Sequence, residues 1–148
     1  MNSNPKNSLD FSSAGMEEYA GNTILEVLQE KSAEDNSSKY VLIKHDYYSA
    51  DSDHGRDMLS CFLDGLCGSS CKTLTVYLVD KGTLLLDNSN PLFEKMKRLS
   101  DKAEMIIAEN ESIIVYGVDV NENPKIEIHS MRSIAEDLIC LPGILTLE

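Results

Sequence analysis

Three of the four cysteines in this chain of 148 residues lie in the stretch CFLDGLCGSSC, from Cys61 to Cys71. Thiol groups this close in sequence could hold a metal, form a redox pair or carry sulfur. A zinc site needs two close pairs of ligands, whereas Cys67 and Cys71 form one pair and Cys140 lies far along the chain. If residues 56–67 are helical, Cys61 and Cys67 lie about 120° apart around the axis and cannot share a ligand. Packing roles are favoured, because free cysteine is among the most buried residue types.

A second group of reactive side chains follows the predicted strands. Its members are His45 and Asp46 after the first strand, Asp80, Lys81 and Gly82 after the second, Glu111 after the third, and His129 after the fourth. The carboxyl ends of parallel strands meet at one edge of a sheet, so we expect these residues to form a ligand-binding rim. Imidazoles beside carboxylates could bind a metal or perform acid–base chemistry.

The competing explanation of this rim is that an acidic protein has polar, acidic loops. No fixed ligand spacing such as His-x-x-x-His is present in the sequence. We therefore predict a small ligand or a partner at the rim, with no metal and no cofactor.

The elements that position these residues follow from the alternation of apolar and amphipathic segments. Strands are predicted at KYVLIKH (39–45), TLTVYLV (73–79), MIIA (105–108), KIEI (125–128) and ILTL (144–147). Helices are predicted around Leu59 to Leu66, after Asn90 as N-cap with Pro91 in the first turn, and after Ser130 as N-cap. The segment SIIVYGVDV (112–120) is ambiguous, since its composition favours a strand but its position requires a crossover. The alternation predicts an α/β three-layer sandwich with a mostly parallel sheet of about five strands, the first two of them in its interior.

Composition and charge narrow the possible partners. The formal net charge of −12 argues against nucleic acid and against an anionic membrane surface, because both attract basic proteins. No apolar run approaches the roughly 18 residues that span a bilayer. The first residues have no apolar signal-peptide core, so we expect a cytoplasmic protein with reduced thiols.

Residues 1–38 differ in composition from the α/β domain expected at 39–148. They are rich in Asn, Ser and acidic residues around one amphipathic stretch, for which a helix from about Met16 to Lys31 is predicted. Two interpretations remain open: a disordered tail, or a helix docked on the domain or on a neighbouring subunit.

The segment from Lys39 to Glu148 resembles the DsrE/DsrF-like family, and most closely the C-terminal domain of YedF-type proteins, which are classed with sulfurtransferases. Four stretches carry the resemblance in the right order: HDYYSADSDHGRDMLSCFLDGL, TVYLVDKGTLLL, NPLFEKMKRLSDKAEMIIAENES and KIEIHSMRSIAEDLICLPGILTL. The second is similar to the family's FLNSGVKL strand and loop, and the third to the helix that leads into its CGTCL motif. The resemblance implies a DsrE-like fold, a role in sulfur metabolism, and assembly into a homo-oligomer.

The family's sulfur-carrier cysteine has no counterpart in this sequence. In the relatives it ends the third strand, in CGTCL, whereas the matching residues here are AENES, from Ala108 to Ser112. A glutamate cannot form a persulfide, and Glu111 places negative charge where a thiolate would approach. Residues 1–38 also lack the CPxP motif of the sulfur-carrier domain found in YedF-type proteins. The catalytic residue is therefore unknown.

Three functions remain open. The favoured one is a DsrE-like protein of sulfur metabolism that binds a small ligand or a sulfur-relay partner at the rim. The second is an active sulfurtransferase that uses a displaced thiol, Cys71 or Cys67. The third is a non-catalytic structural subunit of an oligomer.

Overall fold

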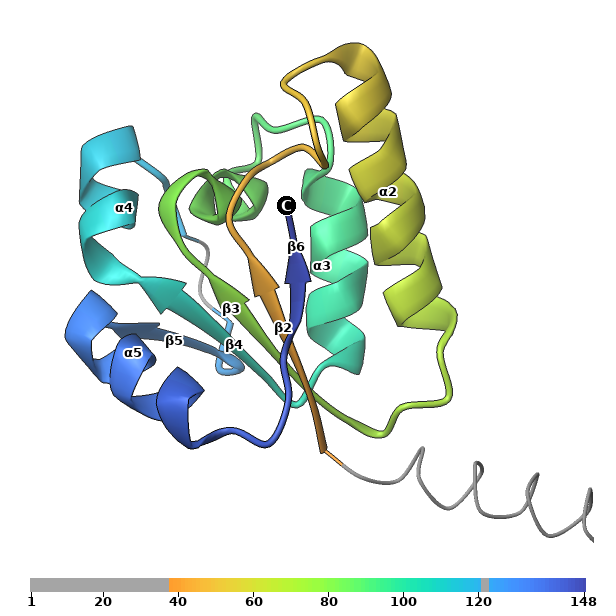
Figure 1. The fold of residues 1–148 in the computed structure, drawn as a ribbon. Coiled ribbons are helices and arrows are strands. Elements are labelled where there is room, and N and C mark those ends of the chain that lie inside the picture. The colour runs from red at the N-terminus through yellow and green to blue at the C-terminus, as the bar shows by residue number, and fades with distance from the viewer. Residues whose placement is uncertain (1–37, 121–122) are drawn as a thin grey trace, which may run out of the picture. The chain divides into compact units, whose positions relative to one another are not determined.

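The computed structural model describes residues 38–120 and 123–148 (Figure 1). Five strands form one sheet in the order β5-β4-β3-β2-β6, and every neighbouring pair is parallel. The strands are β2 (Ser38–Ile43), β3 (Thr73–Leu78), β4 (Met105–Glu109), β5 (Ile126–His129) and β6 (Leu145–Leu147). The predicted five-stranded parallel sheet is confirmed, with β2 and β3 in its interior. The helix predicted from Met16 to Lys31 lies outside the described residues.

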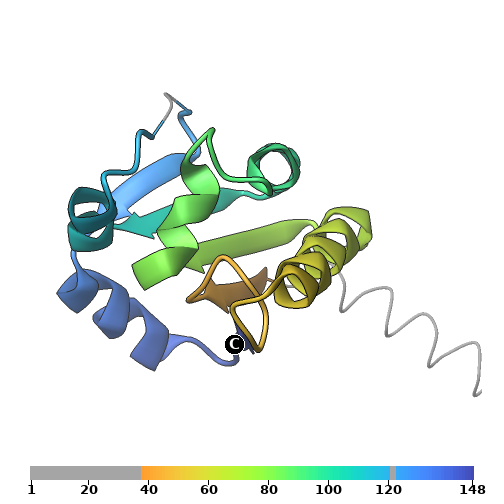
Figure 2. The same ribbon diagram turned by 90° about the horizontal axis from the view of Figure 1, so that it is seen from above.

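Helices connect the strands and cover both faces of the sheet (Figure 2). They are α2 (Asp53–Gly68), the 3-10 helix η1 (Asp80–Leu86), α3 (Phe93–Lys102), α4 (Asn110–Tyr116) and α5 (Met131–Cys140). The helices α2 and α3 lie together on one face of the sheet, and α5 lies on the other face. This is the three-layer arrangement that the alternating sequence predicts.

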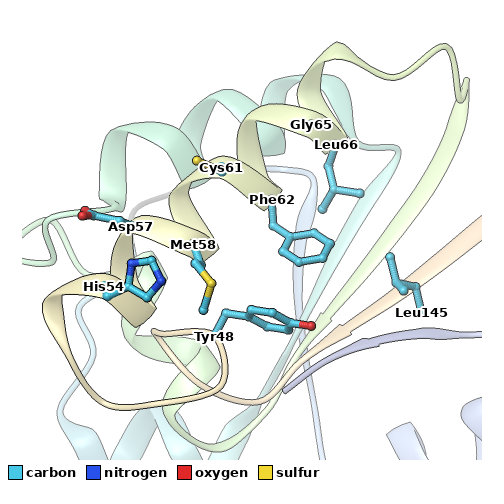
Figure 3. Close-up of a pocket in the computed structure, with 9 residues that line it drawn as sticks. All are labelled: Tyr48, His54, Asp57, Met58, Cys61, Phe62, Gly65, Leu66 and Leu145. Carbon is cyan, nitrogen blue, oxygen red and sulfur yellow. The ribbon is translucent and has the colours of Figure 1, made fainter.

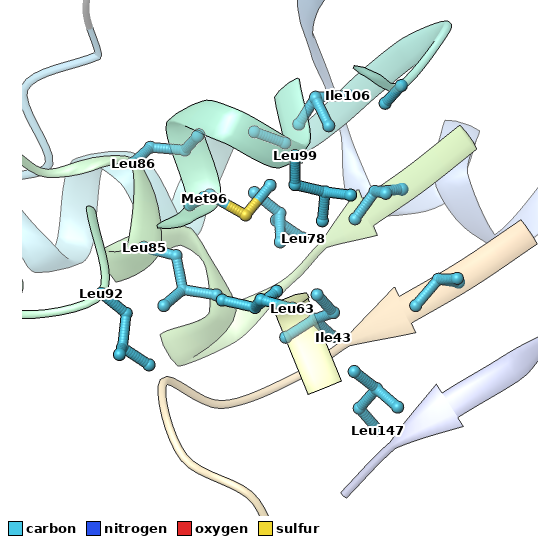
Figure 4. Packing of buried hydrophobic residues seen from close by; sticks show 14 of the residues in the cluster. Ile43, Leu63, Leu78, Leu85, Leu86, Leu92, Met96, Leu99, Ile106 and Leu147 are labelled. Atoms are coloured by element: carbon cyan, nitrogen blue, oxygen red, sulfur yellow. The ribbon is translucent and has the colours of Figure 1, made fainter. Parts of the chain in front are cut away.

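The larger hydrophobic core lies between the sheet and the helices α2, η1 and α3 (Figure 4). Ile43 of β2, Leu63 of α2 and Leu99 of α3 are fully buried there. A smaller cluster on the opposite face centres on Ile134 of α5, which packs against Tyr77 and Ile107 of the sheet. Strands covered on both faces carry near-continuous apolar sequence, which explains why β2 and β3 could be recognised.

Two local predictions need correction or completion. Asn90 is not the N-cap of a helix, because α3 begins at Phe93. Its side-chain oxygen instead accepts a hydrogen bond from the Leu92 amide at 2.8 Å, which closes a turn before the helix.

The ambiguous segment 112–120 supplies most of α4 and the start of the connection to β5. A side-chain cap at Glu109 and a left-handed Gly117 (φ 61°) define this helix, and they outweigh the strand preference of its β-branched residues.

Within residues 38–120 and 123–148, no helix combines the length and the apolar character needed to cross a membrane.

Candidate functional site

The predicted rim residues all lie at or just after the carboxyl ends of strands. His45 and Asp46 follow β2, Asp80 opens η1 after β3, and Glu111 lies in the first turn of α4. The last residue of β5 is His129. All strands are parallel, so these positions share one edge of the sheet.

A hydrogen-bonded chain joins the ends of β3 and β4 through α4. The Asp80 amide donates to Ser112 Oγ at 2.9 Å, and the Ser112 hydroxyl donates to Glu109 Oε1 at 2.5 Å. The Tyr116 hydroxyl donates to Asp80 Oδ1 at 2.5 Å, which raises the pKa of Tyr116 above its usual range. Asp80 itself has φ 50°, a left-handed conformation that few residues other than glycine adopt. Ser112 and Tyr116 therefore fix Asp80 in an unusual backbone geometry from both its amide and its carboxylate.

The carboxylate of Glu109 fills the N-terminus of α4. It accepts hydrogen bonds from the amides of Glu111 at 2.8 Å and Ser112 at 2.9 Å, and only 6% of the residue is exposed. Burial acts to raise the pKa of Glu109, but the hydrogen bonds from the Ser112 hydroxyl and the two amides outweigh it and hold the pKa below its usual range. The donors that a thiolate or another anion would need at this helix end are thus taken by the chain's own carboxylate.

The β2 side of the rim is packed against η1. A Cβ atom at Gly82 would lie 2.2 Å from the carbonyl oxygen of Ile43, so only glycine permits this approach. The rings of His45 and Tyr47 stack with their centroids 4.7 Å apart. Asp46 accepts a hydrogen bond from the side chain of Asn90 at 3.2 Å.

On the β5 side of the rim, an imidazole contacts a carboxylate. His129 Nε2 lies 2.9 Å from Glu127 Oε1, and His129 is the register partner of Glu109 on β4. The buried Nδ1 atoms of His129 and His45 have no hydrogen-bond partner within the described ranges. These two imidazoles do not share a ligand, because β2 and β5 are three strand spacings apart, roughly 14 Å.

The rim is therefore two groups rather than one cluster. His45, Asp46, Lys81 and Gly82 belong to the β2–η1 side, and Glu111 and His129 to the α4–β5 side, with Asp80 hydrogen-bonded across to α4. In the part of the chain that the structure describes, no three His, Cys, Asp or Glu side chains are placed to hold one metal ion.

The cysteines lie away from the rim. Cys67 and Cys71 are partly buried against the larger core, as predicted for packing residues, whereas Cys61 and Cys140 are exposed. Burial raises the pKa of the Cys67 thiol, which lowers its thiolate fraction at neutral pH. Cys71 precedes β3 and so lies at the amino end of the sheet, opposite the rim.

An apolar groove of about 590 Å³ lies beside α2, and sequence reasoning missed it (Figure 3). It is lined by Tyr48, His54, Asp57, Met58, Cys61, Phe62, Gly65, Leu66 and Leu145. The side chains of Met58, Phe62 and Leu66 extend from α2 toward Tyr48 and Leu145. The seven lining residues on α2 recur at intervals of three and four, and this second helical stripe was the available signal. It was missed because the sequence pattern places Phe62 and Leu66 in one sheet-facing stripe with Leu59 and Leu63, whereas Phe62 and Leu66 are only partly buried and line the groove.

Comparison with known proteins supports the fold. No family model matches the sequence, and no curated protein matches it. The crystal structure of the YchN protein from E. coli is similar to this chain, with a TM-score of 0.51 and 12% sequence identity. The likeness covers 75% of this chain and 100% of YchN. At this identity it shows the fold alone, and the expected DsrE-like α/β fold is confirmed.

Proposed function

We propose that this chain is a DsrE-like protein that acts by binding a partner protein, without thiol-based sulfur transfer. The observation that carries the proposal is the apolar groove beside α2, whose lining includes a half-exposed Leu145 (48%) on the edge strand β6. Exposed apolar patches rimmed by polar residues mark surfaces where another chain or a ligand binds.

The end of β4 supports the non-catalytic part of the proposal. Glu109 and Glu111 stand where relatives place the sulfur-carrier motif, and the Glu109 carboxylate uses the local amide donors. Cys67 and Cys71 lie away from this end of the sheet and are partly buried. A displaced-thiol sulfurtransferase, the alternative function, would need a reactive thiolate, whereas burial raises the pKa of Cys67.

Three features of the predicted biology remain part of the proposal. Involvement in sulfur metabolism follows from the resemblance to the family, and a cytoplasmic location follows from the composition. Self-assembly is favoured by a set of exposed apolar side chains on one side of the fold. These are Ile114 and Val115 of α4, Ile128 of β5, and Met131 at the start of α5, which we call the α4–β5 patch.

A second candidate function is binding of a small ligand at the rim. It is favoured by Asp80, since residues held in sparsely populated backbone conformations cluster at functional sites. Lys81 follows Asp80 in η1, and Glu111 lies in the first turn of α4. Together their side chains would offer a polar ligand charges of both signs.

Site-specific photo-crosslinking in cells tests the proposed function. A benzophenone amino acid replaces Met58, inside the groove, or Gly68, on the same helix but outside its lining. We expect a discrete crosslinked partner from position 58 that is lost when Gly65→Leu fills the groove. Equal crosslinking from positions 58 and 68, or none from 58, would overturn the proposal.

Sulfur loading tests the alternative in parallel. The purified chain is treated with a polysulfide and its intact mass is measured. We expect no persulfide on Cys67 or Cys71, because both thiols are partly buried. Rapid loading of either cysteine, with transfer to an acceptor thiol, would establish the sulfurtransferase in place of the binding protein.

A further inference from the structure

The helix α2 presents two neighbouring stripes of side chains, one fully buried in the core and the other only partly buried. Leu59 and Leu63 are fully buried in the larger core. The second stripe, from His54 through Met58 to Leu66, lines the groove. Side chains three and four residues apart on a helix form the surface on which a second helix packs.

The groove has the dimensions of a helix site. From His54 to Leu66 the stripe covers about 18 Å of α2, which is roughly three turns. Leu145 is in register with the buried Val41, so it points to the same side of the sheet as α2, and yet it is half exposed. A helix lying beside α2 would cover Leu145 and complete the layer over the edge strand β6.

Gly65 lets the two helices approach closely. A Cβ atom at this position would meet no heavy atom within 4 Å, so the space above Gly65 is open. Small residues at such positions allow a large side chain of the facing helix to insert. The Tyr48 and Phe62 rings, 5.0 Å apart, form an aromatic part of the same contact surface.

The acidic side chains around the groove favour a partner with basic residues. Asp57 belongs to the lining, and Asp51 and Asp53 are exposed at the N-terminal end of α2. The nearby cation Arg56 is already paired with both Asp51 and Asp53. A second copy of this chain would bring another net charge of −12, and residues 16–31 contain four glutamates against one lysine. Basic residues on the incoming helix would complement this surface.

We infer that the groove binds an amphipathic helix of about three turns, with basic residues beside its apolar stripe, from a partner protein. The inference rests on the proposed partner-binding function and names the class of the partner. Apolar side chains at i, i+3, i+4 and i+7 would fill the space above Met58, Gly65 and Leu145, as in other helix-in-groove complexes.

Model peptides test the class of the partner directly. A dye-labelled peptide of about 18 residues, with Leu on one helical face and Lys elsewhere, is titrated with the full chain and followed by fluorescence anisotropy. We expect saturable binding, at least about tenfold weaker for a twin peptide with Glu in place of Lys. The Gly65→Leu variant should weaken binding by a similar factor, and Gly68→Leu should leave it unchanged. Gly68 is the matched control, because it lies on the same helix, also faces open space and lies outside the lining.

Other occupants give different outcomes. Equal binding of the Lys and Glu peptides, or no effect of Gly65→Leu, overturns the inference. A peptide with the sequence of residues 16–31 that binds more tightly than the Lys peptide overturns it in favour of that segment. Sedimentation of a dimer that only Gly65→Leu dissociates overturns it in favour of a second copy. If the Lys peptide fails while groove-specific crosslinking from position 58 persists in cells, only the partner class is wrong; if both fail, the proposed function fails as well.

Discussion

The backbone amide of Asp80 donates a hydrogen bond to the hydroxyl oxygen of Ser112, 32 residues further along the chain, at 2.9 Å. Through this bond the end of β3 is fixed to the first turn of α4, whose cap is the buried Glu109. The fold thus uses side chains at the end of β4 to build structure.

Replacing Ser112 with alanine should destabilise the domain. The Asp80 amide and the Glu109 carboxylate would each lose a hydrogen bond in a buried or partly buried place. We expect the free energy of unfolding to fall by about 1–3 kcal/mol, measured by urea denaturation. Ser60→Ala on α2, outside this network, is the control. An equal loss of unfolding free energy in both variants would show that the hydrogen bonds joining Asp80, Ser112 and Glu109 add nothing to stability.

Glu109 should make the stability depend on pH in the acid range. Its pKa is lowered in the folded chain, so its contribution is present above the pKa of the unfolded chain, about 4.3, and is lost as pH falls through the lower folded value. We expect the free energy of unfolding to decrease as pH falls below about 4.3, and Glu109→Gln to flatten that decrease. Denaturation curves at several pH values measure the slope, with the exposed Glu104→Gln as control. A slope that Glu109→Gln leaves unchanged would contradict the capping role.

Gly82 should be required for packing rather than for binding a ligand. An alanine Cβ at this position would meet the backbone carbonyl of Ile43 at 2.2 Å, and backbone cannot move aside cheaply. We expect Gly82→Ala to cost roughly 2 kcal/mol or more in the free energy of unfolding. Gly143→Ala, where the added atom would contact nothing within 4 Å, should be nearly neutral in the same assay. A Gly82→Ala variant as stable as the wild-type chain would contradict the packing role and leave ligand binding as the role of Gly82.

The sequence predicted the sheet well because its signals are local and strong. β2 and β3 are apolar almost throughout, and Ser130 caps α5 as expected, with its Oγ accepting from the Ser133 amide at 3.1 Å. The α4 helix was not predicted, since Ile113, Ile114 and Val115 favour a strand and the Glu109 cap depends on tertiary placement. The placement of the rim residues at one edge of the sheet could be predicted, because parallel strands end at the same edge. The separation of His45 from His129 could not, because it depends on the strand order.

The four thiols should fall into two classes of reactivity. Cys61 and Cys140 are exposed and should react quickly with a thiol reagent in the native chain, whereas Cys67 and Cys71 should react slowly. We expect Cys67→Ala to cost on the order of 1 kcal/mol of stability, and Cys61→Ser to be nearly neutral unless another chain contacts it. Timed labelling with mass spectrometry and thermal unfolding measure both effects. A variant at Cys67 or Cys71 that keeps the fold but loses all function would contradict the packing role.

The α4–β5 patch should control self-association. Ile114 and Val115 are 69% and 71% exposed on α4, so their burial between two copies would be favourable. We expect the chain to form a homo-oligomer in sedimentation velocity, and Val115→Glu to shift it toward monomer by placing a charge in the interface. Ile139→Glu is the matched control, because Ile139 is 82% exposed near the end of α5, outside the patch. A wild-type chain that stays monomeric at high micromolar concentration would rule out the assembly. An oligomer that Ile139→Glu disrupts and Val115→Glu leaves intact would place the interface on α5 instead.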